Sequence, residues 1–156
     1  MKNLGIYALI FLGFVVFKTM TGADRDGSGA IVDAGSLDVF QVRVGDCFDD
    51  TDGSEEISSL PAVPCDKPHD NEAYASFNVS LASYPSSEDE MYELAFTSCQ
   101  ERFETFVGRD YESSSLDIYT LYPTNQGWAQ GDREVVCAVF DMEANKLVGS
   151  VKGRGI

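Results

Sequence analysis

Four cysteines are the residues whose type and spacing say most about the chemistry of this chain. Cys47, Cys65, Cys99 and Cys137 follow one another at intervals of 18, 34 and 38 positions. Zinc sites usually draw two ligands from one short C-x₂₋₄-C segment, so this spacing predicts no metal site. An even cysteine set in a small domain indicates disulfides formed in an oxidising compartment. Three pairings are possible, and the local structure favours Cys47 with Cys65 and Cys99 with Cys137.

His69 is the only histidine of the chain, and it is followed closely by Asp70 and Glu72. A histidine beside carboxylates can act as a base or acid in hydrolysis, or bind a divalent ion with their help. The plainer role for the same ring is a hydrogen bond that closes the loop beside a disulfide. Neither a nucleophile elbow nor a phosphate-binding loop accompanies these residues, and no cysteine is left over as a nucleophile. We therefore predict no catalytic residues and no cofactor, and treat the three residues as a candidate contact surface.

Trp128 begins a second group of candidate contact residues, which Asp132 and Arg133 complete, and we expect both groups to share one contact surface. Tryptophans in turn-rich loops anchor interfaces as often as they cover the edge of a core, so both roles stay open for Trp128. Asp132 and Arg133 either pair with each other or stabilise the strand that follows. The acidic run 46–56 is a solvated loop on the plain interpretation and a weak calcium site on the alternative.

The charge of the chain excludes several classes of partner. Its 156 residues include 26 Asp and Glu against 11 Lys and Arg, for a formal net charge of -15. Phosphate backbones and anionic lipid headgroups repel such a chain, so we expect no nucleic-acid binding and no peripheral membrane binding. Hydrophobic residues make up 44% of the sequence, which is enough for one folded domain.

The N-terminal segment is the part of the sequence that points to a membrane. Residues 4–17 carry no charge and lie between Lys2 and Lys18. As a helix they extend about 21 Å, short of the ~30 Å hydrocarbon core, which is typical of a cleaved signal with its cut before Asp24. If Lys18 extends its amine toward the headgroups, the apolar stretch reaches Ala23 and can span as an anchor. We expect contact with the membrane through this segment only.

Residues 24–36 are polar and glycine-rich, as flexible linkers are. Asp24 and Asp26 begin a pattern like that of a calcium-binding EF-hand loop. The twelfth position of that loop requires a bidentate glutamate and here is Gly35, so we predict no calcium site. The expected organisation is a signal-anchor or transmembrane segment over 1–23, a flexible acidic linker over 24–36 and an extracytoplasmic domain over 37–156.

Hydrophobic periodicity predicts an α+β domain in which one long helix packs on an antiparallel sheet. The helix spans 87–108, with Ser87 and Glu90 as a capping box and Gly108 as its end. Alternating apolar residues place Phe40, Val42 and Val44 on the inward side of the first strand. The predicted strands cover 37–44, 72–79, 116–122, 134–140 and 146–151.

Short motifs along the domain carry a resemblance to a known family. They are Gly45-Asp46-Cys47-Phe48, Val63-Pro64-Cys65, Pro68-His69-Asp70, Glu72, Tyr84-Pro85, Cys99, Val107-Gly108, Pro123-Thr124, Trp128, Gly131-Asp132-Arg133 and Val136-Cys137. As an ordered set, from about Val44 to Asp141, they are similar to the septum formation family, small extracytoplasmic domains typical of actinobacterial envelope proteins.

This resemblance implies a link with cell division and no defined reaction. We therefore expect a non-catalytic, membrane-anchored interaction domain outside the cell, single-pass in the cell membrane or secreted if the signal is cleaved. The expected partner is an envelope or division protein. The alternatives are a sensor module that binds an envelope ligand or a cation, and, less favoured, a hydrolase that uses His69 with Asp70 or Glu72.

Overall fold

The structure is a computed structural model that describes residues 21–51 and 57–156. The predicted membrane segment lies outside these residues except for its last three positions. Among the described residues, no helix has the length and apolar character needed to cross a bilayer.

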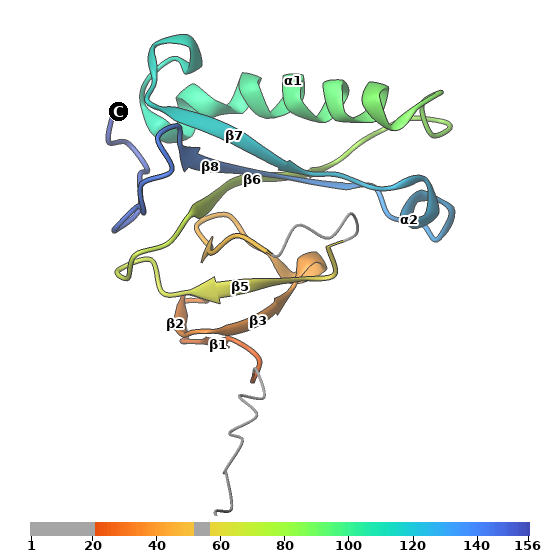
Figure 1. Cartoon of the computed structure of the whole chain (residues 1–156). Helices are drawn as coiled ribbons and strands as arrows, with labels where there is room; N and C mark the ends of the chain where they lie inside the picture. The colour runs from red at the N-terminus through yellow and green to blue at the C-terminus, as the bar shows by residue number, and fades with distance from the viewer. Residues whose placement is uncertain (1–20, 52–56) are drawn as a thin grey trace, which may run out of the picture.

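A six-stranded antiparallel sheet forms the centre of the domain, with strand order β3-β5-β4-β6-β8-β7. A separate two-stranded sheet pairs β1 with β2, and one long helix, α1, lies along β6, β7 and β8 (Figure 1). The strands are β1 Asp24–Arg25, β2 Ile31–Asp33, β3 Gly35–Asp38, β4 Cys47–Phe48, β5 Ser59–Val63, β6 Asn71–Asn78, β7 Leu116–Leu121 and β8 Glu134–Asp141. The helices are α1 Glu88–Val107 and α2 Asn125–Ala129, with 3-10 turns η1 Val39–Gln41 and η2 Tyr111–Ser113. The predicted α+β class with its antiparallel sheet and single long helix is confirmed.

Helix α1 forms where the capping signals predict it. The backbone N–H of Glu90 donates to Ser87 Oγ at 3.2 Å, and Glu90 Oε2 accepts from the Ser86 N–H at 3.1 Å. The helix ends at Gly108, whose φ of 82° lies in the left-handed region that favours glycine. Its buried residues follow the predicted spacing of three and four and are Met91, Ala95, Cys99, Phe103, Phe106 and Val107.

The sheet separates two hydrophobic cores. The helix core lies under α1 and takes Val135, Cys137 and Val139 from β8. The second core lies on the other face and takes Val136 and Ala138 from the same strand. Because β8 lies between β6 and β7 and is buried on both faces, it has the predicted character of a central strand.

Two disulfides link elements of these layers, in the pairing that the local structure favoured. Cys99 on α1 is bonded to Cys137 on β8, and Cys47 on β4 is bonded to Cys65 just after β5. No free cysteine remains among the described residues. The predicted disulfides are therefore confirmed.

The first predicted strand is only partly correct. β3 ends at Asp38, whose carboxylate accepts from the Phe40 N–H at 2.9 Å and starts the turn η1. Phe40 is therefore 63% exposed and Val44 54% exposed, although alternation predicted both to point inward. On β6 a bulge between Ala73 and Ala75 similarly places Ala73 in the second core, away from its predicted companions.

Two other expectations are wrong. The predicted linker 24–36 is folded, because it forms β1, β2 and the start of β3, and because Ile31 is buried in the second core. The predicted strand 146–151 is not a strand. It contributes one isolated bridge, between Leu147 and His69. The rest of it is held by a backbone bond from the Gly149 N–H to the Cys65 carbonyl and by the bonds of Ser150 and Val151 to Glu72.

Candidate functional site

The predicted contact residues do not form one surface. His69, Asp70 and Glu72 lie at the beginning of β6, whereas Asp132 and Arg133 lie just before β8 begins. In the β6–β8 register Asn71 faces Phe140 and Asn78 faces Glu134, so the two groups are at opposite ends of this strand pair. Seven residues of extended strand place them about 20 Å apart.

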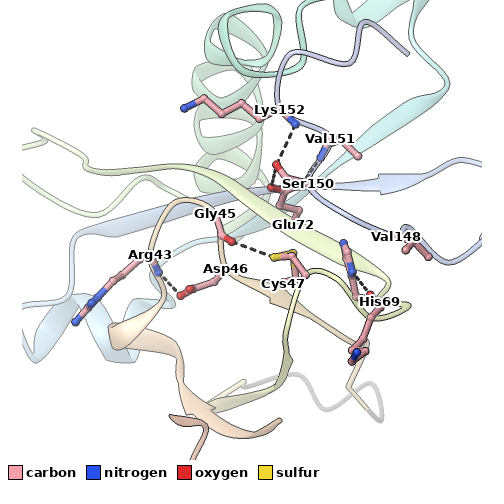
Figure 2. Close-up of a disulfide and its surroundings, with 12 residues drawn as sticks. Arg43, Gly45, Asp46, Cys47, His69, Glu72, Val148, Ser150, Val151 and Lys152 are labelled. Atoms are coloured by element: carbon pink, nitrogen blue, oxygen red, sulfur yellow. Dashed lines mark hydrogen bonds between the residues drawn. A yellow bond between two sulfur atoms is a disulfide. The ribbon is translucent and has the colours of Figure 1, made fainter. Parts of the chain in front are cut away.

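His69 and Glu72 belong to the interior, with exposed fractions of 0% each. The His69 ring donates from Nδ1 to the Lys67 carbonyl at 2.8 Å, and the His69 backbone pairs with Leu147 in both directions. Glu72 accepts from the Ser150 hydroxyl at 2.5 Å and from the Val151 N–H at 2.7 Å (Figure 2). The Glu72 side chain and the His69 backbone therefore fasten the C-terminal segment, whereas the His69 ring bonds its own loop, which is the plainer of its predicted roles. Neither side chain presents a surface to a partner.

Asp70 lies at the surface beside this buried pair. Its Oδ2 accepts from the Asp50 N–H at 2.9 Å and lies 2.8 Å from the Lys146 amine, which also contacts Asp49 at 2.8 Å. Partial burial raises the pKa of Asp70, but the hydrogen bonds from Lys146 and Asp50 outweigh it and hold the pKa below its usual value. The carboxylates of Asp49 and Asp70, which both contact the amine, raise the pKa of Lys146.

Trp128 covers an edge of the helix core and is only 9% exposed. Its ring meets Tyr84 edge-on with centroids 5.8 Å apart, and the Arg133 guanidinium lies 3.5 Å over its centroid. Arg133 also donates to the Trp128 carbonyl at 2.8 Å, while Asp132 Oδ1 accepts from the Glu134 N–H at the start of β8. Of the two predicted roles for Trp128, the structure favours the core-edge role.

A groove that the sequence analysis missed lies beside this second group. We call it the Phe40 groove; it has a volume of about 520 Å³ and runs between η1, α2 and the face of β7 and β8 turned away from α1. Its lining includes Phe40, Tyr119, Leu121, Tyr122, Gln126, Gln130, Glu88, Asp132 and Glu134. An adjoining hollow of about 470 Å³ shares Phe40, Asp132 and Glu134 with it and adds Arg133. The exposed Phe40 ring at its rim makes this groove a candidate binding site, because a large apolar side chain is exposed there.

The Phe40 groove is acidic. Glu88, Asp132 and Glu134 line it, and its lining in the described residues contains neither lysine nor arginine. Burial raises the pKa of Tyr122, and the negative charges of Glu88 and Asp89 raise it further. Tyr119 shows the same direction, from burial and from the charge of Asp50. The groove therefore has the chemistry to accept a positively charged group next to apolar surface.

His69 and Glu72, which we call the buried pair, lie away from the groove and belong to a group of three side chains of the kind that bind metal ions. A sulfur of Cys47, a ring nitrogen of His69 and a carboxylate oxygen of Glu72 lie within 4.8 Å of one another, and all three residues are buried. Because Cys47 is bonded to Cys65, only the imidazole and the carboxylate could act as metal ligands in this state.

Comparison with known proteins identifies the family. Neither the curated proteins nor the solved structures contain a match to this chain. A protein-family model described as septum formation matches residues 44–154, a range that includes all four cysteines, the buried pair and most of the groove lining. The chain therefore belongs to the septum formation family.

Proposed function

We propose that this chain is a non-catalytic interaction domain of the cell envelope, tethered to the membrane by its N-terminal segment and acting in septum formation. It binds a basic, partly apolar segment of an envelope or division protein in the Phe40 groove. The observation that carries the proposal is the exposed Phe40 ring beside the carboxylates of Asp132 and Glu134.

Charge and shape both favour such a partner. An interface gains most from an aromatic side chain buried at its centre, and Phe40 is available for this role. Carboxylates around an aromatic anchor favour lysine or arginine on the partner and speed its approach, and the net charge of -15 acts in the same direction.

Other features support the remaining parts of the proposal. The apolar segment 4–17 supports a membrane tether, and two disulfides support residence in an oxidising compartment. The burial of His69 and Glu72 argues against a hydrolase, since in this conformation neither side chain can reach a substrate. Membership of the family supports the link with division.

A peptide titration with the full chain tests the groove. The probes are a fluorescent peptide of alternating lysine and leucine and the same peptide with glutamate for lysine. We expect only the lysine peptide to bind, with an affinity that falls as salt rises. Phe40→Ala should weaken it at least tenfold and change the free energy of unfolding by no more than about 0.5 kcal/mol. Met142→Ala, which also removes an exposed apolar side chain, is the matched control. The proposal is contradicted if the chain binds both peptides equally well, or if the Phe40→Ala and Met142→Ala variants bind the lysine peptide equally well.

The septum role is tested in cells. A photo-crosslinking amino acid at position 40 should capture one envelope or division protein with a basic segment outside the membrane, and the same probe at position 142 should not. Phe40→Ala at normal protein level should reproduce the septum phenotype of a deletion strain. Normal septa in that variant would refute the assigned groove.

A further inference from the structure

His69 has a buried ring nitrogen that nothing in the described part of the chain satisfies. Its Nδ1 lies 2.8 Å from the Lys67 carbonyl, which can only accept, so Nδ1 carries the proton. In the neutral ring, Nε2 then presents a lone pair, and this atom has no hydrogen-bond partner among the described residues. A buried polar atom left unpaired costs about 1–3 kcal/mol, so its retention calls for a function.

The surroundings of this ring are those of a metal ligand. Metal-binding histidines usually donate the other ring N–H to a carbonyl or carboxylate, as His69 does to Lys67. Glu72 is likewise oriented, because Ser150 and Val151 each hold one of its oxygens. Figure 2 shows Cys47, His69 and Glu72 around one small region beneath the C-terminal segment.

Whether four metal ligands are available depends on whether the Cys47 and Cys65 sulfurs are bonded to each other. While Cys47 and Cys65 are bonded to each other, neither is a thiolate, and a disulfide sulfur is a poor ligand for zinc. Opening the bridge frees the Cys47 sulfur beside the imidazole and the carboxylate, and the Cys65 sulfur that was bonded to it. Four such ligands make a closed tetrahedral zinc site, and the soft sulfurs disfavour calcium and magnesium.

The distances allow this site with small side-chain movements. Zinc lies about 2.0–2.3 Å from nitrogen, oxygen and sulfur ligands, so tetrahedral ligand atoms are roughly 3.3–3.8 Å apart. The ligand atoms of Cys47, His69 and Glu72 already lie within 4.8 Å of one another. A cysteine released from its partner can rotate about its Cα–Cβ bond and close the remaining gap.

We propose that Cys47, Cys65, His69 and Glu72 form a zinc site that exists only when the Cys47–Cys65 bridge is open. A dithiol reductant supplies two electrons and two protons to the bridge and itself becomes a disulfide. Zn²⁺ then binds both sulfurs and displaces the two thiol protons. The bridge and the metal are therefore alternative crosslinks between the same two cysteines, so the metal holds this region together when the bridge is open. This inference is independent of the proposed function.

The cysteine spacing predicted no zinc because it considers sulfur ligands alone. The fold adds one ligand from the loop before β6 and one from β6 itself, so no paired cysteine motif is needed. The other disulfide offers no such set: among the described residues, the one group of three potential metal ligands is the one around Cys47.

Cobalt binding to the full chain tests the proposal, because tetrahedral Co²⁺ with thiolate ligands has characteristic visible and near-ultraviolet bands. Cys65 is partly exposed, whereas Cys99 and Cys137 are fully buried, so limited treatment with a phosphine should open only the first bridge. Thiol counting selects the sample with two thiols per chain, and near-ultraviolet circular dichroism verifies that it is folded. Cobalt is added after the phosphine is removed, and zinc is then used to displace it.

We expect one Co²⁺ per chain in the two-thiol sample, displaced by zinc, and none in the oxidised protein. His69→Gln and Glu72→Gln should each weaken binding at least tenfold. Asp70→Asn, a neighbouring carboxylate outside the set, should leave binding unchanged. If the His69→Gln variant does not fold, Glu72→Gln carries the same test. The proposal is overturned by a two-thiol sample without tetrahedral bands, by equal binding in the oxidised protein, or by variants that bind as tightly as Asp70→Asn.

Discussion

The Cys99–Cys137 bridge lies in an apolar core, whereas the Cys47–Cys65 bridge lies beside buried polar side chains. Around the first, the neighbours are aromatic and aliphatic residues of α1 and β8, such as Phe103 and Val135. Near the second, His69, Asn71 and Glu72 are all buried.

The same contrast extends to the two faces of the sheet. On the helix side, packing of one long amphipathic helix holds the structure together. On the other side, which we call the polar side, short strands and ion pairs such as that of Arg25 with Asp46 contribute more, and the Phe40 groove belongs to this half. The proposed zinc site lies on the helix side of β6, because Glu72 is paired with Val139 and binds the segment that contributes Leu147 and Val151 to the helix core. The helix side therefore contains the larger of the two cores, and we expect it to contribute more to the stability of the domain than the polar side.

Removal of a disulfide should lower the free energy of unfolding more than the other changes, and the size of the loss should differ between the two bridges. In the chain-entropy model, loss of the link across 38 positions costs about 4 kcal/mol and loss of the link across 18 costs about 3 kcal/mol. Cys99→Ala with Cys137→Ala also leaves a cavity in the helix core, which increases the difference.

We therefore expect the free energy of unfolding, measured in urea by Trp128 fluorescence, to fall further for this pair than for Cys47→Ala with Cys65→Ala. Equal losses, or the reverse order, would show that the helix core is not the more stable region.

Arg25→Ala should have the next largest effect, because it breaks a paired charge on the polar side. The two terminal nitrogens of Arg25, Nη1 and Nη2, each donate to one oxygen of the Asp46 carboxylate at 2.6 Å, and Asp46 is only 4% exposed. These hydrogen bonds raise the pKa of Arg25. Removing one partner leaves a buried carboxylate without its charge partner, at a cost of about 3 kcal/mol.

The matched control is Lys67→Ala, which breaks the exposed pair with Asp66 and should change stability by no more than about 0.5 kcal/mol. Urea denaturation measures both variants. Similar small losses for the two would mean that residues 24–36 behave as the flexible linker that their composition predicted.

The helix side could be predicted from the sequence because its signals are local. The capping residues of α1 and the spacing of its apolar face are visible over 20 residues. β7 alternates over its six residues, and β8 is apolar over the six residues 135–140. These signals placed Cys99 and Cys137 on neighbouring inner faces and thereby indicated their bridge.

The polar side could not be predicted in the same way. β1 and β4 have two residues each, too few to show any period. The turn between β1 and β2 did carry a signal: Asp26 Oδ1 accepts from the N–H groups of Ser28 and Ala30, and Gly29 has a φ of 92°. Such turns also occur in linkers, so this signal alone does not predict the two strands beside it.

The candidate sites depend on contacts between distant parts of the chain. Ser150, which binds Glu72, is 78 positions away from it, and the Phe40 groove joins η1 to residues beyond position 118. Local patterns contain no information on such contacts, so the sequence predicted His69 and Glu72 as part of a contact surface, although the fold buries both side chains.

The smallest expected effect concerns the surface pair of Asp70 and Lys146, next to the buried histidine. The pKa of Asp70 is lowered in the folded state, so the pair stabilises the fold above the unfolded value near pH 4 and loses this effect as pH falls through the lower folded value. The raised pKa of Lys146 gives the opposite limit, with stabilisation lost only as pH rises through a folded value above about 10.4.

Asp70→Asn should therefore reduce the free energy of unfolding by up to about 1 kcal/mol at pH 7, and by progressively less as pH falls below about 4. Asp66→Asn, at an exposed site, removes the same charge and corrects for the lower repulsion within this acidic chain. Urea denaturation of both variants at pH 7 and pH 3 makes the comparison. A loss of equal size at both pH values would show that Asp70 acts through its hydrogen bond to Asp50 and not through its charge, and the polar side would then depend on Arg25 and Asp46 as its main ion pair.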